Sequence, residues 1–301
     1  MKQPAPYRVL LAVDPFEQDL PLSITAINEL HYLVQHLGAS FEAVHILSDS
    51  RSDQKIDLAY RRTQEALKNS SWVKHLGIHI PCTVIVDQST LRNHASAALL
   101  EYAEEIRANL ILVCSHGRKW LSRLVMGSFA ETLLSLSPLP ILFFSPNPPK
   151  NPKFDRVLFA TDFSENSKKG FELFLKQMAP LNPEVILYHA VPSPELINNY
   201  SLMGLGAYIP NQYWKAEKEI LIEAGREWAD LARPQKIEVK VVIEDFVDHI
   251  AHTIQKTADH HQVSIIGMVT STPPLERAFA GSIAAGVYRS RKQSVWVYRS
   301  R

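Results

Sequence analysis

The sequence is poor in cysteine, in long apolar runs and in net charge, and each shortage excludes a class of protein. Its two cysteines, Cys82 and Cys114, cannot form the disulfide framework of a small secreted domain and suit a reducing compartment. No segment reaches the run of about 18 apolar residues that a membrane span requires. The N-terminal segment has no apolar core of a secretory signal. We therefore expect a cytoplasmic protein with no membrane partner.

A formal net charge of +1 gives the chain no field that would attract nucleic acid, because 32 basic residues are interspersed with 31 acidic ones. The sequence has no P-loop, no serine nucleophile elbow and no zinc-binding H-E-x-x-H helix. Among twelve histidines, His249 with His252 and His260 with His261 form pairs that no cysteine or carboxylate completes at ligand spacing. We expect no nucleic-acid partner, no catalytic residue and no metal ligand.

What the sequence does contain is an internal repeat. Residues 8–14, RVLLAVD, correspond to residues 156–162, RVLFATD, and residues 127–130, GSFA, correspond to residues 281–284, GSIA. The matched segments follow the same order in both halves, which chance resemblance explains poorly. Each half therefore carries one copy of the same domain.

The stretch SPNPPKNPK at 145–153 separates the two copies. Its four prolines can continue neither a helix nor a central strand. We therefore expect a first domain of residues 1–146, a linker of residues 147–153 and a second domain of residues 154–301.

Each copy alternates short apolar runs with segments of helical periodicity. Runs such as VLLAV and LILVC are continuously apolar, which is typical of strands buried on both faces. The alternation predicts an α/β fold with a parallel, doubly wound sheet. The expected strands are 7–13, 40–47, 79–86, 109–114 and 140–144, then 155–161, 183–190, 237–243, 262–267 and 294–298. The expected helices are 22–37, 58–75, 91–107 and 128–136 in the first copy and 212–231 in the second.

In such a sheet, ligands bind at the carboxyl ends of the strands where the winding direction reverses. The first strand ends there at Ala12 and Asp14, and the fourth strand leads into the loop from Cys114 to Ser128. A glycine and a serine at the start of a helix offer unpaired N–H groups and the positive end of the helix dipole, which suits phosphate. Asp14 can accept hydrogen bonds from a base amine or a sugar hydroxyl.

Structural roles compete with these functional ones. Ser128 and Glu131 have the spacing of a capping box, which would start a helix with or without a ligand. Asp14 and Asp162 each follow a strand, where aspartate commonly initiates a turn. Both roles stay open at this point.

The loop resembles that of the universal stress protein family, whose form is G-x2-G-x9-G-[ST]. The first copy has His116, Gly117, nine residues, then Gly127 and Ser128, with Cys114 in place of the first glycine. The resemblance covers nearly the whole chain, as the tandem form of that family. It implies two five-stranded domains of the adenine nucleotide alpha hydrolase type, each with strand order 3-2-1-4-5.

The resemblance also implies binding of ATP or a related adenine nucleotide, with or without Mg²⁺. Carried over to this chain, Asp14 and the backbone of Val44 contact the base or ribose, and the glycines and Ser128 hold the phosphates with the amide of Phe129. The predicted nucleotide-binding residues of the first copy are Ala12, Asp14, Val44, Cys114, His116, Gly117, Gly127, Ser128 and Phe129.

The second copy keeps fewer of these features. Asp162 follows its first strand, Gly267 is aligned with the first loop glycine, and Gly281 with Ser282 precedes a helix. Thr270 then replaces the second glycine, the stretch to Gly281 is one residue too long, and a diproline within it removes two N–H donors. Asp162, Gly267, Gly281 and Ser282 therefore form a weaker predicted site.

The last strand of each copy is expected at a sheet edge, where its backbone groups need partners. In the family that this chain resembles, such strands commonly pair across a two-fold axis. We expect residues 140–144 to lie beside residues 294–298, as an intramolecular pseudo-dimer that leaves a further homodimer possible.

Two functions from different classes remain. The first is a non-catalytic stress or regulatory protein that binds an adenine nucleotide mainly through the first copy. The second is a nucleotide-independent scaffold or chaperone-like protein with a protein partner, which the altered loops and the apolar segment at 200–210 would suit. A slow nucleotide hydrolase is the weakest alternative, because no residue is an evident base to activate water.

Overall fold

The computed structural model describes residues 7–13, 31, 34–48, 52–87, 94–114, 128–145, 153–193, 214–270, 277–290 and 292–299. Its strands are β1 (Tyr7–Ala12), β2 (Ala39–Ser48), β3 (Cys82–Asp87), β4 (Leu110–Cys114), β5 (Ile141–Phe144), β6 (Lys153–Ala160), β7 (Glu184–Pro192), β8 (Val239–Val247), β9 (Val263–Thr270) and β10 (Ser294–Arg299). Its α-helices are α2 (Asp53–Asn69), α3 (Ser71–Leu76), α4 (His94–Glu105), α5 (Ser128–Leu136), α6 (Glu165–Met178), α8 (Trp214–Asp230), α9 (Ile250–His260) and α10 (Arg277–Arg289).

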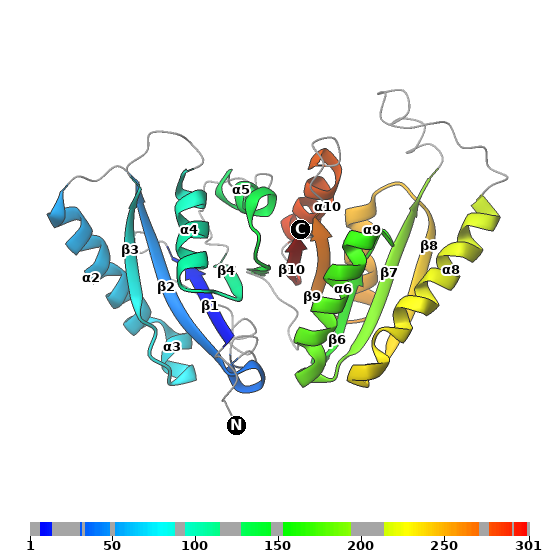
Figure 1. The fold of residues 1–301 in the computed structure, drawn as a ribbon, viewed down its shortest axis with the longest axis horizontal. Coiled ribbons are helices and arrows are strands. Elements are labelled where there is room, and N and C mark those ends of the chain that lie inside the picture. Colours follow the sequence, from blue (N-terminus) through cyan, green and yellow to red (C-terminus); the bar gives the residue numbers. More distant parts are fainter. Residues whose placement is uncertain are drawn as a thin grey trace.

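The ten strands form one continuous sheet, in the order β3-β2-β1-β4-β5-β10-β9-β6-β7-β8, with helices on both faces (Figure 1). Each copy has the order 3-2-1-4-5 within itself, and its neighbouring strands run parallel. The predicted fold class is therefore confirmed. Helices α2 and α8 lie at the two far ends of the molecule (Figure 1).

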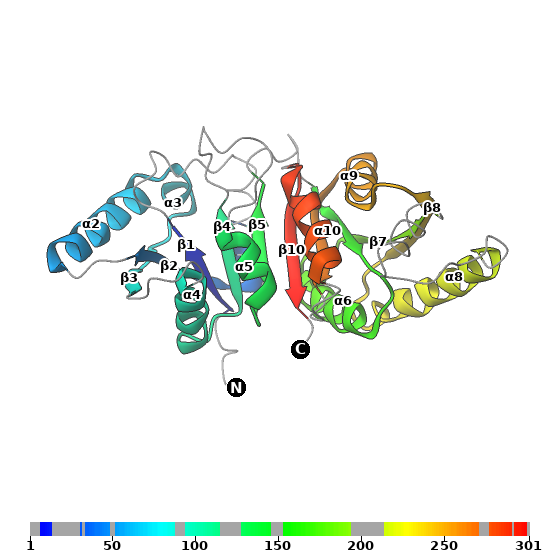
Figure 2. The ribbon, with the colours of Figure 1, turned by 90° about the horizontal axis from the view of Figure 1, so that it is seen from above.

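The two copies join through β5 and β10, which lie side by side at the centre of the sheet (Figure 2). This pair is antiparallel, with Phe143 opposite Val295, Leu142 opposite Trp296 and Ile141 opposite Val297. All four side chains of β5 are buried. Because the pairing occurs within one chain, the expected intramolecular pseudo-dimer is confirmed.

A hydrophobic core covers each face of this sheet, and each core runs through both copies. One core takes Leu142 and Phe144 from β5 with Trp296 and Tyr298 from β10, and α2, α6 and α8 pack on it. The other core takes the alternate residues of the same strands and is covered by α4, α5, α9 and α10. Side chains of successive strand residues point to opposite faces, so the continuously apolar runs serve both cores.

A polar contact also crosses between the copies. The side-chain amide of Gln177, on α6, donates to the hydroxyl of Tyr7 at 2.8 Å, and the hydroxyl of Tyr298 donates to the amide oxygen of Gln177. On the other face, the ring of Phe143 lies 4.9 Å from that of Tyr288, centre to centre. Buried polar groups need partners, so Gln177 satisfies two tyrosines at once.

Several element bounds differ from those expected. The helix expected at 58–75 begins at Asp53 and breaks at Ser70, whose extended ψ of 128° separates α2 from α3. Serine and asparagine at this point compete for backbone hydrogen bonds and favour helix ends. The helix expected at 22–37 is described only at residue 31 and residues 34–37. The loop at 200–210 and most of the linker lie outside the described residues. Among the described helices, none combines the length and apolarity needed to cross a bilayer.

Candidate functional site

The winding direction of the first copy reverses between β1 and β4, and these strands end side by side. Ala12, the last residue of β1, lies opposite Val113 of β4 on one side and Val44 of β2 on the other. The structure thus places Ala12 and the end of β4 at the switch point, where open α/β sheets bind ligands.

Helix α5 starts at this same edge, because it runs back between two parallel strands. It begins at Ser128, as predicted, and the carbonyl of Phe129 accepts a hydrogen bond from the hydroxyl of Ser96 at 3.4 Å. The first four amides of an α-helix have no acceptor within the helix. The amides of Ser128 and Phe129 belong to this set, and the helix dipole adds to their attraction for an anion.

Other predicted residues of the first site lie outside the described residues. These are Asp14, His116, Gly117 and Gly127. Their roles therefore stay predictions, as does the capping box of Ser128. Cys114 is the last residue of β4 and pairs with Phe144 of β5.

Val44 lies inside the sheet of the first copy. Its side chain is only 1% exposed, and its carbonyl accepts a hydrogen bond from the amide of Val13 at 2.9 Å. Val44 thus lies inside the sheet, with its carbonyl committed to the neighbouring strand. The predicted contact of its backbone with a base stays a prediction.

A matched pair of histidines supports the end of the first strand in each copy. Nδ1 of His45 lies 3.0 Å from the carbonyl oxygen of Val13, and Nδ1 of His189 lies 2.7 Å from that of Thr161. A carbonyl only accepts, so Nδ1 carries the proton in both histidines. Val13 and Thr161 directly precede the two predicted aspartates. His45 and His189 take equivalent places in the repeat, so both copies use the same hydrogen bond.

Asp162 of the second copy serves the start of α6. Its Oδ1 accepts from the amide of Ser164 at 3.0 Å, from the hydroxyl of Ser164 at 2.7 Å and from the hydroxyl of Ser167. Burial alone would raise the pKa of Asp162, but the bonds from Ser167 and Ser164 outweigh it and hold the pKa below its ordinary value. The structural role of this aspartate, as a turn and helix-start residue, is thus present without a ligand.

The residue after Asp162 adopts an uncommon backbone conformation. Phe163 has φ of 58°, in the left-handed region that aromatic residues seldom enter. Its ring lies 5.1 Å from that of His189 and 5.2 Å from that of Trp228, measured between centres. Packing of the ring therefore holds this turn against its backbone strain.

The position of Gly267 differs from the one expected. It lies within β9, which runs three residues past the expected end, and it pairs with Phe159 of β6. The first copy has Leu112 opposite Leu11 in the equivalent register. Since residues 8–14 correspond to residues 156–162, Gly267 takes the place of Leu112 and not that of the first loop glycine.

The reason for a glycine at 267 is packing. A Cβ atom there would lie 2.7 Å from the ring of Phe174 and 2.8 Å from the ring of Phe159, closer than real Cβ contacts come. The register also places Val269 at the position of Cys114. Sequence alignment of the glycines missed this, because only strand pairing reveals the offset of two residues.

Gly281 and Ser282 differ from their expected position at a helix start. Helix α10 begins at Arg277, so the two residues lie in its second turn. Amides there donate to carbonyls four residues earlier and are not available to an anion. The second copy therefore lacks the helix start at Ser282 that the first copy has at Ser128. Within the described part of the chain, no three His, Cys, Asp or Glu side chains gather as around a metal ion.

Comparisons with known proteins agree with this geometry. A model of the universal stress protein family matches residues 7–145 and again residues 153–299. The structure of a universal stress protein from Archaeoglobus fulgidus is similar over 98% of this chain and 99% of its own, with TM-score 0.65 and 19% identity. A functionally unknown protein from Pseudomonas aeruginosa covers 98% of this chain and 93% of its own, with TM-score 0.61 and 15% identity. No curated protein matches the sequence. The family model covers nearly the whole chain in two passes, and the chain belongs to the universal stress protein family in its tandem form.

Proposed function

We propose that this chain is a stress-response or regulatory protein that binds one adenine nucleotide of the ATP type, in the first copy. The start of α5 carries the proposal. Its amides at Ser128 and Phe129 lack acceptors within the helix and lie at the switch point. In the second copy, Gly281 and Ser282 lie inside α10, which removes the corresponding anion site.

The loop sequence supports the same assignment, because Gly117 and Gly127 allow close approach of the backbone to phosphate. Mg²⁺ would accompany the phosphates as their counter-ion. We propose a non-catalytic role, since no evident base is available to activate water. The scarcity of cysteine and the near-neutral charge suit the cytoplasm.

Isothermal titration calorimetry with ATP, with and without Mg²⁺, tests the proposal. We expect one nucleotide per chain and no hydrolysis above the background of a purified blank. Ser128→Pro removes one amide donor at a position where a helix tolerates proline, and should weaken ATP binding about tenfold. Ser128→Ala keeps that amide and should weaken binding much less.

Ser282→Ala is the matched control, because its residue lies within the second turn of α10, and binding should not change. No binding at millimolar ATP would overturn the proposal. Two nucleotides per chain would overturn its restriction to the first copy.

The second copy has a structural function that its geometry favours directly. Its last strand, β10, covers β5, and its aspartate, glycine and helix start all serve its own packing. We propose that it acts as the fixed partner of the first copy. In this sense the second copy is a scaffold for the first.

A further inference from the structure

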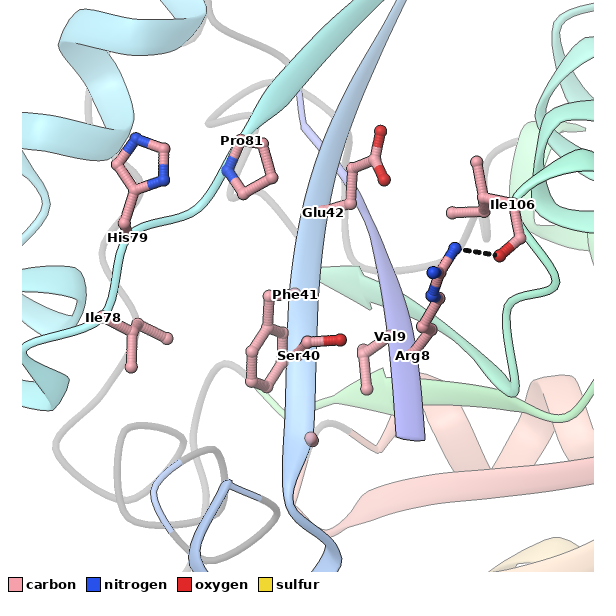
Figure 3. A pocket seen from close by; sticks show the side chains of 10 residues that line it. Arg8, Val9, Ser40, Phe41, Glu42, Ile78, His79, Pro81 and Ile106 are labelled. Carbon is pink, nitrogen blue, oxygen red and sulfur yellow. Dashed lines mark hydrogen bonds between the residues drawn. The ribbon is translucent and has the colours of Figure 1, made fainter. Parts of the chain in front are cut away.

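The first copy holds a pocket of about 570 Å³ at the amino ends of its strands, on the edge of the sheet opposite the candidate nucleotide site (Figure 3). The first residues of β1 and β2 line it, together with the segments that lead into β3 and β4. Phe41 and Ile78 line it from one face of the sheet, and Ile106 lines it from the other face, together with Arg8 and Glu42, which bring charges of opposite sign. Its volume falls in the range of small-molecule sites, roughly 300–1,000 Å³.

Arg8 forms no ion pair with any of the described residues. Its Nη1 donates to the carbonyl of Ile106 at 2.7 Å, as the dashed line in Figure 3 marks. A guanidinium has five N–H donors in a fixed plane. The bond to Ile106 therefore orients the group while leaving donors for a carboxylate, which arginine binds with two parallel hydrogen bonds.

The carboxylate of Glu42 is fixed by hydrogen bonds from two hydroxyl groups. Its Oε1 accepts from the hydroxyl of Thr83 at 3.2 Å and from the hydroxyl of Tyr102. Burial, together with this bond to Glu42, raises the pKa of Tyr102, which keeps the hydroxyl a donor. Figure 3 shows Glu42 and Arg8 on the same side of β2. One free cation and one fixed carboxylate thus face a single pocket.

In the second copy, the arginine at this edge of the sheet forms an ion pair. Arg156 has the position of Arg8 in the repeat, and its Nε lies 2.9 Å from Glu184. The strand registers pair Arg156 with Glu184 and Arg8 with Ser40. The exchange of glutamate for serine therefore releases Arg8 from its partner strand.

Glu42 is likewise specific to the first copy. The register pairs Glu42 with Leu10 and pairs Ile186 with Leu158, so an isoleucine stands at this position in the second copy. The first copy thus has both charges where the second has an ion pair and an apolar residue.

We propose that this pocket binds a small zwitterion with an apolar body, of the class of the apolar α-amino acids. The carboxylate of the ligand pairs with Arg8 and its ammonium group with Glu42. Its apolar part lies against Ile106, which is on the same face of the sheet as the two charges. This site is independent of the nucleotide proposed above, because the two lie at opposite edges of the sheet.

Calorimetry with L-phenylalanine, 3-phenylpropionate and phenethylamine on the full chain tests the proposal. Phenylalanine should bind at least tenfold more tightly than either analogue, since each analogue lacks one charge. Saturating ATP should leave its affinity unchanged. Equal binding of 3-phenylpropionate would overturn the zwitterion assignment in favour of a plain anion site. No binding of phenylalanine at 10 mM would overturn the site altogether.

Variants of the chain give the sharper test. Ser40→Glu rebuilds on Arg8 the ion pair of the second copy and should weaken phenylalanine binding at least tenfold. Ser40→Gln adds a side chain of the same size without the charge, and should weaken binding clearly less than Ser40→Glu does. Glu42→Gln keeps an acceptor for Tyr102 and should lower affinity about tenfold. Melting curves confirm that each variant is folded, and equal binding by Ser40→Glu and Ser40→Gln would overturn the role of Arg8.

Discussion

The two copies keep the same sheet and differ at its carboxyl edge. Both have the strand order 3-2-1-4-5, and in both a histidine forms a hydrogen bond to the carbonyl at the end of the first strand. Helix α5 starts at its serine, whereas α10 starts four residues before its glycine. The comparison teaches that the helix start at the carboxyl edge can change while the sheet stays the same, because different residues maintain the two.

Gly267→Leu gives the second copy the residue that the first copy has at this strand position, and we expect the largest effect from it. The new side chain would collide with Phe159 and Phe174, and overpacking of this kind costs roughly 3 kcal/mol of unfolding free energy. Urea unfolding followed by circular dichroism measures the loss.

Adding Phe159→Leu to that variant restores the leucine pair of the first copy and should recover part of the stability. A double-mutant cycle gives the coupling between the two positions. Additive effects would show that the two positions do not share one packing solution.

Phe163→Pro places at this turn the residue type that follows the aspartate of the first copy. Proline has φ fixed near −65° and cannot adopt 58°, so we expect a loss of about 2 kcal/mol beyond that of Phe163→Gly. The glycine variant removes the same ring but permits positive φ. Thermal unfolding of both proteins separates backbone strain from ring packing, and equal melting temperatures would contradict the strain.

The contact between the copies should weaken in alkali. Burial raises the pKa of Tyr7 and of Tyr298 above that of an unfolded tyrosine, near 10. The folded state therefore holds these protons more tightly, so the stability that the two tyrosines contribute is constant below about pH 10 and falls as the pH rises above it. Each tyrosine contributes up to about 1.4 kcal/mol per pH unit there.

Tyr7→Phe should reduce this alkaline slope, which unfolding at pH 9, 10 and 11 would measure. Gln177→Leu should cost about 1–2 kcal/mol at neutral pH, because it leaves two buried hydroxyls without their partner. An unchanged slope in Tyr7→Phe would assign the alkaline loss to other groups.

The smallest expected effect comes from the two histidines. His45→Ala and His189→Ala each remove one hydrogen bond to a strand-end carbonyl, which is worth about 1 kcal/mol. If nucleotide binds only in the first copy, His45→Ala should also weaken ATP binding, whereas His189→Ala should not. Calorimetry compares the ATP affinities of the two variants. Equal affinities would mean that His45 contributes to stability but not to nucleotide binding.

The sequence predicted the strands and the repeat well, because buried parallel strands have a pattern that few other elements share. It also predicted the start of α5 at Ser128, because cap residues mark a helix start locally. It missed the role of Gly267. This position has no room for a side chain because of Phe174, which lies on a helix far away in the sequence. It also missed the start of α10, where no strong cap signal stands before Arg277. Features that depend on neighbouring residues in the sequence could be predicted, and features that depend on packing between elements could not.

The antiparallel junction of β5 and β10 has a consequence for synthesis. β5 is complete at Phe144, but its partner is not made until the ribosome has added the residues up to Arg299. At about 5–20 residues per second, those residues take roughly 10–30 s. During that time the first copy presents a bare, wholly apolar strand edge, the kind of surface that chaperones guard. The strand that joins the two copies is thus the last of the described strands to be synthesised.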